Sequence, residues 1–118
     1  MSINNAIASV AVKDLKSAVI WYEALLGRPP DSTPMPELAE WKFEHGGWLQ
    51  VYQLAERAGS GSFTLAVSNI EEVVAHVEKL GIDATQRSSG AMVKTLMIGD
   101  LDGNHIAFSE PLDKSIAR

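Results

Sequence analysis

The sequence contains one pattern twice, and this internal repeat limits the possible folds more than any other feature. A short apolar segment, "AIASVAV" (6–12), is followed by "KDLKSAVIWYEALLG", in which apolar residues recur at the spacing of an amphipathic helix that ends at Gly27. The same order returns in "SFTLAV" (62–67) and "SNIEEVVAHVEKLG", where Gly81 follows Gly27 by 54 residues. We therefore predict a duplicated module whose halves each begin with a strand and a helix.

The ends of both predicted helices carry recognisable signals. Asp14 or Ser17 can cap the start of the first helix. Asn69 and Glu72 have the spacing of a capping box at the start of the second, with Asn in the Ser/Thr position. A glycine follows each helix, at a position that favours the left-handed backbone conformation.

Extended segments follow each helix and complete the two halves. In the first half they are 40–45 and 48–54, separated by a Gly46-Gly47 turn, with a short edge strand in the proline-rich "GRPPDSTPMPE". In the second half they are 84–88, 92–98 and 105–109, with turns at Ser89-Gly90 and Asp102-Gly103. The predicted fold class is α+β: two tandem βαβββ modules form a cupped, mostly antiparallel sheet with a helix behind each half.

The repeat also predicts the domain organisation. We expect a single domain over residues 1–118, with module 1 at about 1–55, a flexible linker "AERAGSGS" at about 55–61, and module 2 at about 62–112.

Composition excludes several classes of function. The formal net charge is −5, from 10 basic and 15 acidic residues, and argues against nucleic-acid binding. The sequence has no cysteine, which excludes disulfides and thiolate chemistry. It shows no secretory signal and no apolar run of membrane-spanning length, so we expect a cytoplasmic protein with no membrane partner.

Strand alternation predicts which side chains face away from the helices. We expect this open face to hold aromatic residues and a few polar groups, which is typical of a small-molecule pocket. Aromatic residues on a sheet face more often belong to the core or to a subunit interface, and a pocket shared at a dimer interface would satisfy both the pocket and the interface interpretation. The expected lining residues are Ser9, Trp48, Gln50, Tyr52, Ser62, Thr64 and His105, with Trp41 and Phe43 as further candidates.

Three motifs resemble the vicinal oxygen chelate superfamily, which includes glyoxalases, bleomycin-resistance proteins and extradiol dioxygenases. They are "VAVKDLKSAVIWYEALLG" (10–27), "LAVSNIEEVVAHVEKLG" (65–81) and "DLDGNHIAF" (100–108), where Leu101 replaces the usual proline. The resemblance covers nearly the whole chain and implies the fold described above and a homodimer. It does not imply one reaction, because this fold hosts many.

The resemblance also implies where metal-dependent members place their ligands. Carried over by the motifs, those positions are Ile7, Gln50, Ser62 and Ala107, of which only Gln50 keeps a group that coordinates well. A catalytic divalent site usually needs three imidazole or carboxylate ligands. We therefore expect no metal and no other cofactor.

Two functional hypotheses follow, with a third kept open. The first is a metal-independent protein that binds an aromatic or amphipathic ligand through Trp48 and Tyr52, oriented by Gln50, Ser62 and His105. The second is a glyoxalase- or dioxygenase-like enzyme acting in the same concavity, with His105 as general base and Gln50 polarising a carbonyl. The third is an inactive partner or regulatory subunit that is kept for its interface.

Overall fold

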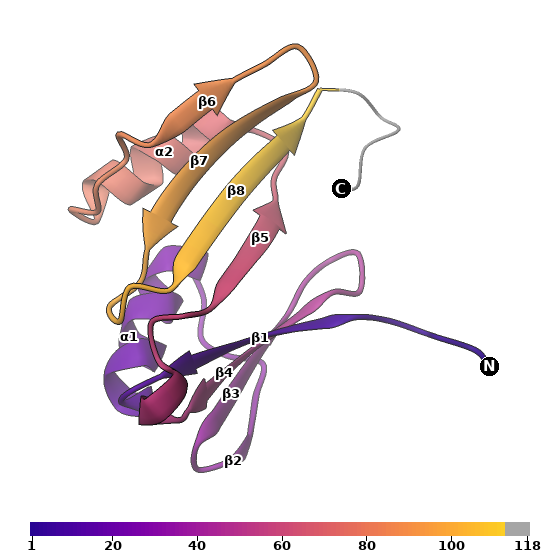
Figure 1. Cartoon of the computed structure of the whole chain (residues 1–118), viewed down its shortest axis with the longest axis vertical. Coiled ribbons are helices and arrows are strands. Elements are labelled where there is room, and N and C mark those ends of the chain that lie inside the picture. Colours follow the sequence, from indigo (N-terminus) through magenta and orange to yellow (C-terminus); the bar gives the residue numbers. More distant parts are fainter. Residues whose placement is uncertain (113–118) are drawn as a thin grey trace. The chain divides into compact units, whose positions relative to one another are not determined.

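The computed structural model describes residues 1–112, and it confirms the duplicated α+β fold (Figure 1). Each half has the order strand, helix and three strands. The first half consists of β1 (Ile7–Val12), α1 (Leu15–Leu26), β2 (Ser32–Met35), β3 (Leu38–Lys42) and β4 (Trp48–Gln53). After the short 3₁₀ helix η1 (Ala55–Arg57), the second half consists of β5 (Ser62–Ala66), α2 (Ile70–Lys79), β6 (Arg87–Ser89), β7 (Val93–Gly99) and β8 (His105–Pro111).

Each half forms its own four-stranded sheet with the same topology. The strand orders are β1-β4-β3-β2 and β5-β8-β7-β6. In each sheet the first strand pairs in parallel with the last strand of its module, and the remaining pairs are antiparallel. The register between the first and last strands of each module is also repeated: Ser9 lies beside Gln50 in one sheet, and Thr64 lies beside Ala107 at the equivalent place in the other.

The predicted helix caps are confirmed. The Asp14 carboxylate caps α1 and accepts hydrogen bonds from the backbone amide and the hydroxyl of Ser17, at 3.3 and 2.6 Å. The Asn69 side chain caps α2 and accepts from the amides of Glu71 and Glu72. The glycines that follow the helices, Gly27 and Gly81, have φ values of 80° and 78°, a conformation that costs glycine little.

A second repeated contact ties the last strand of each module to the start of its helix. The Gln53 side chain at the end of β4 accepts a hydrogen bond from the Leu15 amide at 2.9 Å. At the equivalent place in the second half, the Glu110 side chain in β8 accepts from the Ile70 amide at 2.8 Å. Both bonds satisfy a helix N-terminal amide that has no partner within the helix.

One face of each sheet is buried under its helix. α1 packs on β3 and β4, and α2 packs on β7 and β8. Strand residues alternate between this core and the open face, as predicted for Leu49, Val51, Ile106 and Phe108, which are all buried. Nineteen apolar residues are buried in the described chain.

The described chain divides into two compact units. The first contains residues 1–61 together with the turn Leu101–Asn104, and the second contains residues 62–100 and the segment from His105 onward. The concavity expected from combining the two open faces stays a prediction.

The segment expected to be a flexible linker is held by a buried side chain. The Asn104 carboxamide oxygen accepts from the amides of Gly59 and Gly61, at 3.0 and 2.8 Å. Its nitrogen donates to the Ala11 carbonyl at 2.9 Å. The turn that precedes β8 is therefore fastened to the first unit. In residues 1–112, no helix is both long enough and apolar enough to cross a membrane.

Candidate functional site

The open face of the first sheet gathers the aromatic side chains that the sequence predicts for a ligand site. Trp48, Gln50 and Tyr52 alternate along β4 and point away from α1, while the intervening Leu49 and Val51 are fully buried. Trp48 and Tyr52 are each half-buried, so part of each ring remains accessible. The Lys42 ammonium lies 5.9 Å from the centre of the Trp48 ring, within cation–π range.

A row of hydrogen-bonded polar side chains crosses this face between the two aromatic residues. The Ser9 hydroxyl donates to Gln50 Oε1 at 3.1 Å, and Gln50 Nε2 donates to Glu40 Oε2 at 2.6 Å. The Ser32 hydroxyl then donates to Glu40 Oε1 at 2.9 Å. The row spans all four strands of the sheet, because these residues are cross-strand neighbours.

The carboxylate of Glu40 determines which groups donate and which accept in the hydrogen bonds of this row. A carboxylate only accepts hydrogen bonds, so the adjacent Gln50 must turn its NH₂ group toward it. The Gln50 oxygen then faces Ser9, whose hydroxyl hydrogen is used in the bond between them. Ser9 therefore presents oxygen lone pairs, rather than its hydrogen, to anything bound beside it.

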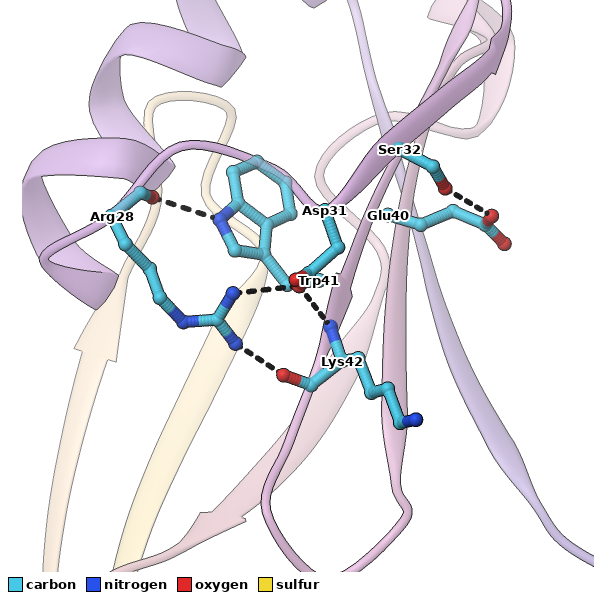
Figure 2. A network of polar contacts seen from close by, with 6 residues as sticks. All are labelled: Arg28, Asp31, Ser32, Glu40, Trp41 and Lys42. Carbon is cyan, nitrogen blue, oxygen red and sulfur yellow. Dashed lines mark hydrogen bonds and ion pairs between the residues drawn. The ribbon is translucent and has the colours of Figure 1, made fainter.

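The expectation that Trp41 joins this open face is wrong. Trp41 is fully buried on the α1 side of the sheet, beside Leu49, with its ring centre 6.1 Å from that of Tyr22. Its Nε1 donates to the Arg28 carbonyl at 3.0 Å. Figure 2 shows the Trp41 ring and the Glu40 carboxylate on opposite sides of β3. Phe43, the other candidate, lies beyond the end of β3 and is half-buried.

A charged network at the edge of the sheet holds the segment that leads into β2 (Figure 2). Asp31 Oδ2 accepts from Arg28 Nη1 at 2.6 Å and from the Lys42 amide at 2.7 Å. These bonds, the one from Arg28 first, hold the pKa of Asp31 below its ordinary value. Arg28 also donates to the Lys42 carbonyl. The network fixes the β2–β3 hairpin that carries Ser32 and Glu40.

A pocket opens on this face beside Tyr52. Its volume is about 430 Å³ and it is open to solvent on one side. Its walls combine apolar side chains, one aromatic ring and several polar groups, which is the usual composition of a small-molecule site. The lining residues are Ser9, Met35, Glu37, Leu38, Gln50, Tyr52 and Gln53.

The open face of the second sheet carries small and hydroxylated side chains. Ser62 and His105 are cross-strand neighbours, as are Thr64 and Ala107. Ser62, Thr64 and His105 are exposed, as expected for a face away from α2. Apart from Trp41 and Phe43, the expected lining residues of each unit lie on that unit's own open face.

The residues at the family's ligand positions do not fit a divalent metal ion. The side chains of Ile7 and Ala107 are hydrocarbon, and Ser62 offers only a neutral hydroxyl. Gln50 has a coordinating oxygen, but that oxygen already accepts from Ser9. In the part of the chain that the structure describes, no group of three or more His, Asp or Glu side chains could hold a metal.

Glu40 is the site residue that sequence reasoning missed. In "EWKFEH" the polar residues Glu40, Lys42 and Glu44 alternate with Trp41 and Phe43. Because the buried face takes the apolar positions, this alternation itself places Glu40 on the open face beside Gln50. The sequence therefore contained the signal for Glu40. The prediction instead assigned the aromatic residues Trp41 and Phe43 to the open face.

Comparison with known proteins identifies the fold and the family. No protein-family model and no curated protein matches the chain. A solved glyoxalase / bleomycin resistance protein from Catenulispora acidiphila is 34% identical, with a TM-score of 0.81, over 90% of this chain and 96% of that one.

Two further solved structures are similar in fold alone. Lactoylglutathione lyase from Agrobacterium tumefaciens is 16% identical, with a TM-score of 0.78, over 93% of this chain and 95% of its own. TnmS3, an antibiotic binding protein from a Streptomyces species, is 19% identical, with a TM-score of 0.77, over 94% of this chain and 98% of its own.

The duplicated βαβββ units, with equivalent registers in both sheets, define a protein of the vicinal oxygen chelate fold class. The identity and coverage of the Catenulispora match then narrow the class. The chain belongs to the glyoxalase/bleomycin resistance protein family of that superfamily.

Proposed function

We propose that this protein binds an aromatic or amphipathic small molecule without using a metal ion. The observation that carries the proposal is the open face of the first sheet. It places two half-buried aromatic rings, Trp48 and Tyr52, on either side of the polar row, next to a pocket of about 430 Å³. Such rings provide contact area, and the polar groups between them orient a ligand.

Two further observations support the proposal. TnmS3, which has the same fold, is an antibiotic binding protein. The family's ligand positions keep only one coordinating group, Gln50, and its side chain is engaged by both Ser9 and Glu40. Binding requires only a preformed surface, whereas a metal-dependent reaction requires ligands that these positions lack.

We include the second sheet in the proposed ligand-binding set. Ser62, Thr64 and His105 lie on its open face, and each offers a polar group that can hydrogen-bond a ligand. His105→Ala is expected to weaken binding. An unchanged affinity would remove the second sheet from the proposal.

The test is a titration of the ¹⁵N-labelled protein with 1-naphthylmethanol, an uncharged aromatic probe, with and without excess EDTA. We expect resonances of Trp48, Gln50 and Tyr52 to shift, with the same affinity in EDTA. Trp48→Ala should weaken binding by roughly 1–3 kcal/mol, because the apolar area of the ring is lost from the contact. Trp41→Phe is the matched control, because Trp41 lies on the buried face.

Two results would contradict the proposal. One is the absence of any shift at these three residues at millimolar probe. The other is binding that disappears in EDTA and returns with added divalent metal.

We also propose that the chain forms a homodimer, as the family resemblance implies. Exposed apolar residues on the open faces, Ile7 and Met97, are 53% and 39% accessible and provide surface that a second copy can cover. Light scattering should give a molar mass of twice 12.8 kDa. A mass of one chain at high concentration would rule the dimer out.

A further inference from the structure

The pocket beside Tyr52 has an electrostatic bias that points to the chemistry of its ligand. Within the described residues, Glu37 is the one charged residue among those that line the pocket. Lys42, the cation of this face, pairs with Trp48, whereas the pocket residue Leu38 pairs with Tyr52. Four residues along β3 separate the two places by about 13 Å, and Lys42 is not among the residues that line the pocket.

Glu37 is held in position by its backbone. It lies in the turn between β2 and β3, and its carbonyl accepts from the Gln53 amide at the end of β4 at 2.8 Å. The turn is thus fastened to the same strand that carries Tyr52. Glu37 is exposed and is one of the residues that line the pocket.

The polar row adds a hydrogen-bond acceptor, the Ser9 hydroxyl, to the residues that line the pocket. The hydrogen of the Ser9 hydroxyl is directed to Gln50, because Glu40 turns the Gln50 amide toward itself. Ser9 therefore offers the pocket an acceptor. A ligand group bound in this pocket is favoured if it carries a positive charge and several N–H donors.

Tyr52 supplies the remaining recognition element. Its ring is half-buried between Ala11 and Leu38, its cross-strand neighbours, so one part of the aromatic surface faces the pocket. An ammonium group near an aromatic ring is attracted by the ring quadrupole. The apolar side chains of Met35 and Leu38 complete a wall for the hydrocarbon part of the ligand.

We propose that this pocket binds the protonated amine of an aromatic or amphipathic ligand, with Glu37 as its counter-charge and Ser9 as an acceptor. The inference rests on the proposed function and narrows it to cationic ligands. It predicts different affinities for probes that share one aromatic ring system and differ in the charge of their polar group.

The test compares 1-naphthylmethylamine, 1-naphthylmethanol and 1-naphthoate in titrations of the labelled protein at low salt. We expect the amine to bind about three- to tenfold more tightly than the alcohol, and the carboxylate to bind most weakly. Glu37→Gln should bring the amine-to-alcohol ratio close to one. Glu23→Gln, which removes the same charge from the exposed face of α1, should leave the ratio unchanged.

The outcomes separate this inference from the function on which it rests. Alcohol binding at Gln50 and Tyr52 with no preference for the amine would overturn the cationic ligand but leave the binding function standing. A preference for the amine that survives Glu37→Gln would overturn the role of Glu37. No binding of any of the three probes would overturn both proposals.

Discussion

Asn104 is the one buried polar residue among those that the structure describes. It is fully buried, and it joins the turn before β8 to β1 and to the segment after η1. Two backbone amides and one backbone carbonyl have the Asn104 side chain as a hydrogen-bond partner. A buried polar group without a hydrogen-bond partner costs free energy. We therefore expect the loss of the Asn104 side chain to lower the free energy of unfolding.

Asn104→Ala should therefore lower the free energy of unfolding by about 2–4 kcal/mol, since it leaves three backbone groups without their partner. Urea denaturation measures the loss. The matched control is Asn5→Ala, which removes an exposed, hydrogen-bonded asparagine of the same unit and should change stability by about 0.5 kcal/mol or less. Equal effects of the two substitutions would show that burial of Asn104 is not what matters.

The orientation of single side chains on β3 shows where sequence reasoning fails. On β4, alternation predicts correctly that Trp48, Gln50 and Tyr52 share the open face. On β3 the same rule places Trp41 inside, but tryptophan is typical of both cores and binding sites. Once Trp41 is inside, its indole N–H bonds to the Arg28 carbonyl. Nothing in the sequence pattern shows that partner.

At the scale of the elements, the start of α1 depends on one ionised side chain. The hydroxyl and the amide of Ser17 donate to the Asp14 carboxylate. These hydrogen bonds, the hydroxyl first, lower the pKa of Asp14 below its ordinary value of 3.8. A carboxyl whose pKa is lower in the folded state stabilises the fold above its unfolded pKa, and this stabilisation is lost as the pH falls through the folded pKa.

Asp14→Asn should thus cost more stability near neutral pH than in acid. We expect the difference in unfolding free energy between wild type and variant to shrink as pH falls from about 5 to about 2. Chemical denaturation at several pH values measures it. A difference that is constant or grows toward low pH would mean that the Asp14 charge does not support the cap.

The elements themselves could largely be predicted from the sequence, for a physical reason. The amphipathic spacing and terminal signals of α1 and α2 are local, and the structure confirms both caps. The edge strands β2 and β6 are four and three residues long and mostly exposed, so they are too short to show a clear alternating pattern. The caps by Gln53 and Glu110 could not be foreseen, since each joins residues about 40 positions apart.

At the scale of the whole molecule, the duplication explains both what is shared and what differs between the halves. Equivalent registers place Gln50 and Ala107 at corresponding positions of two similar sheets. In the first sheet this position belongs to a polar row with Glu40, whereas in the second it is a methyl group. The same framework thus carries a polar, aromatic face in one half and a small, hydroxylated face in the other.

The repeat did not reveal that the turn Leu101–Asn104 belongs with the first unit. Sequence periodicity assigns it to the second module, because the turn lies between β7 and β8. Its contacts, the Asp102 carboxylate with the Lys13 amide and Asn104 with Ala11, join residues about 90 positions apart. Such long-range partners are set by tertiary packing and leave no periodic signal.

The central claim is that this family member binds its ligand without a metal, and the amount of metal bound per chain tests it most directly. The measurement is elemental analysis of untagged protein, purified without chelators and then dialysed against zinc, manganese or nickel. We expect well below 0.1 equivalent per chain, because Ile7, Ser62 and Ala107 offer no strong ligand. About one metal per chain, lost on substitution of Gln50 by alanine, would contradict the account and restore a metal-dependent reaction.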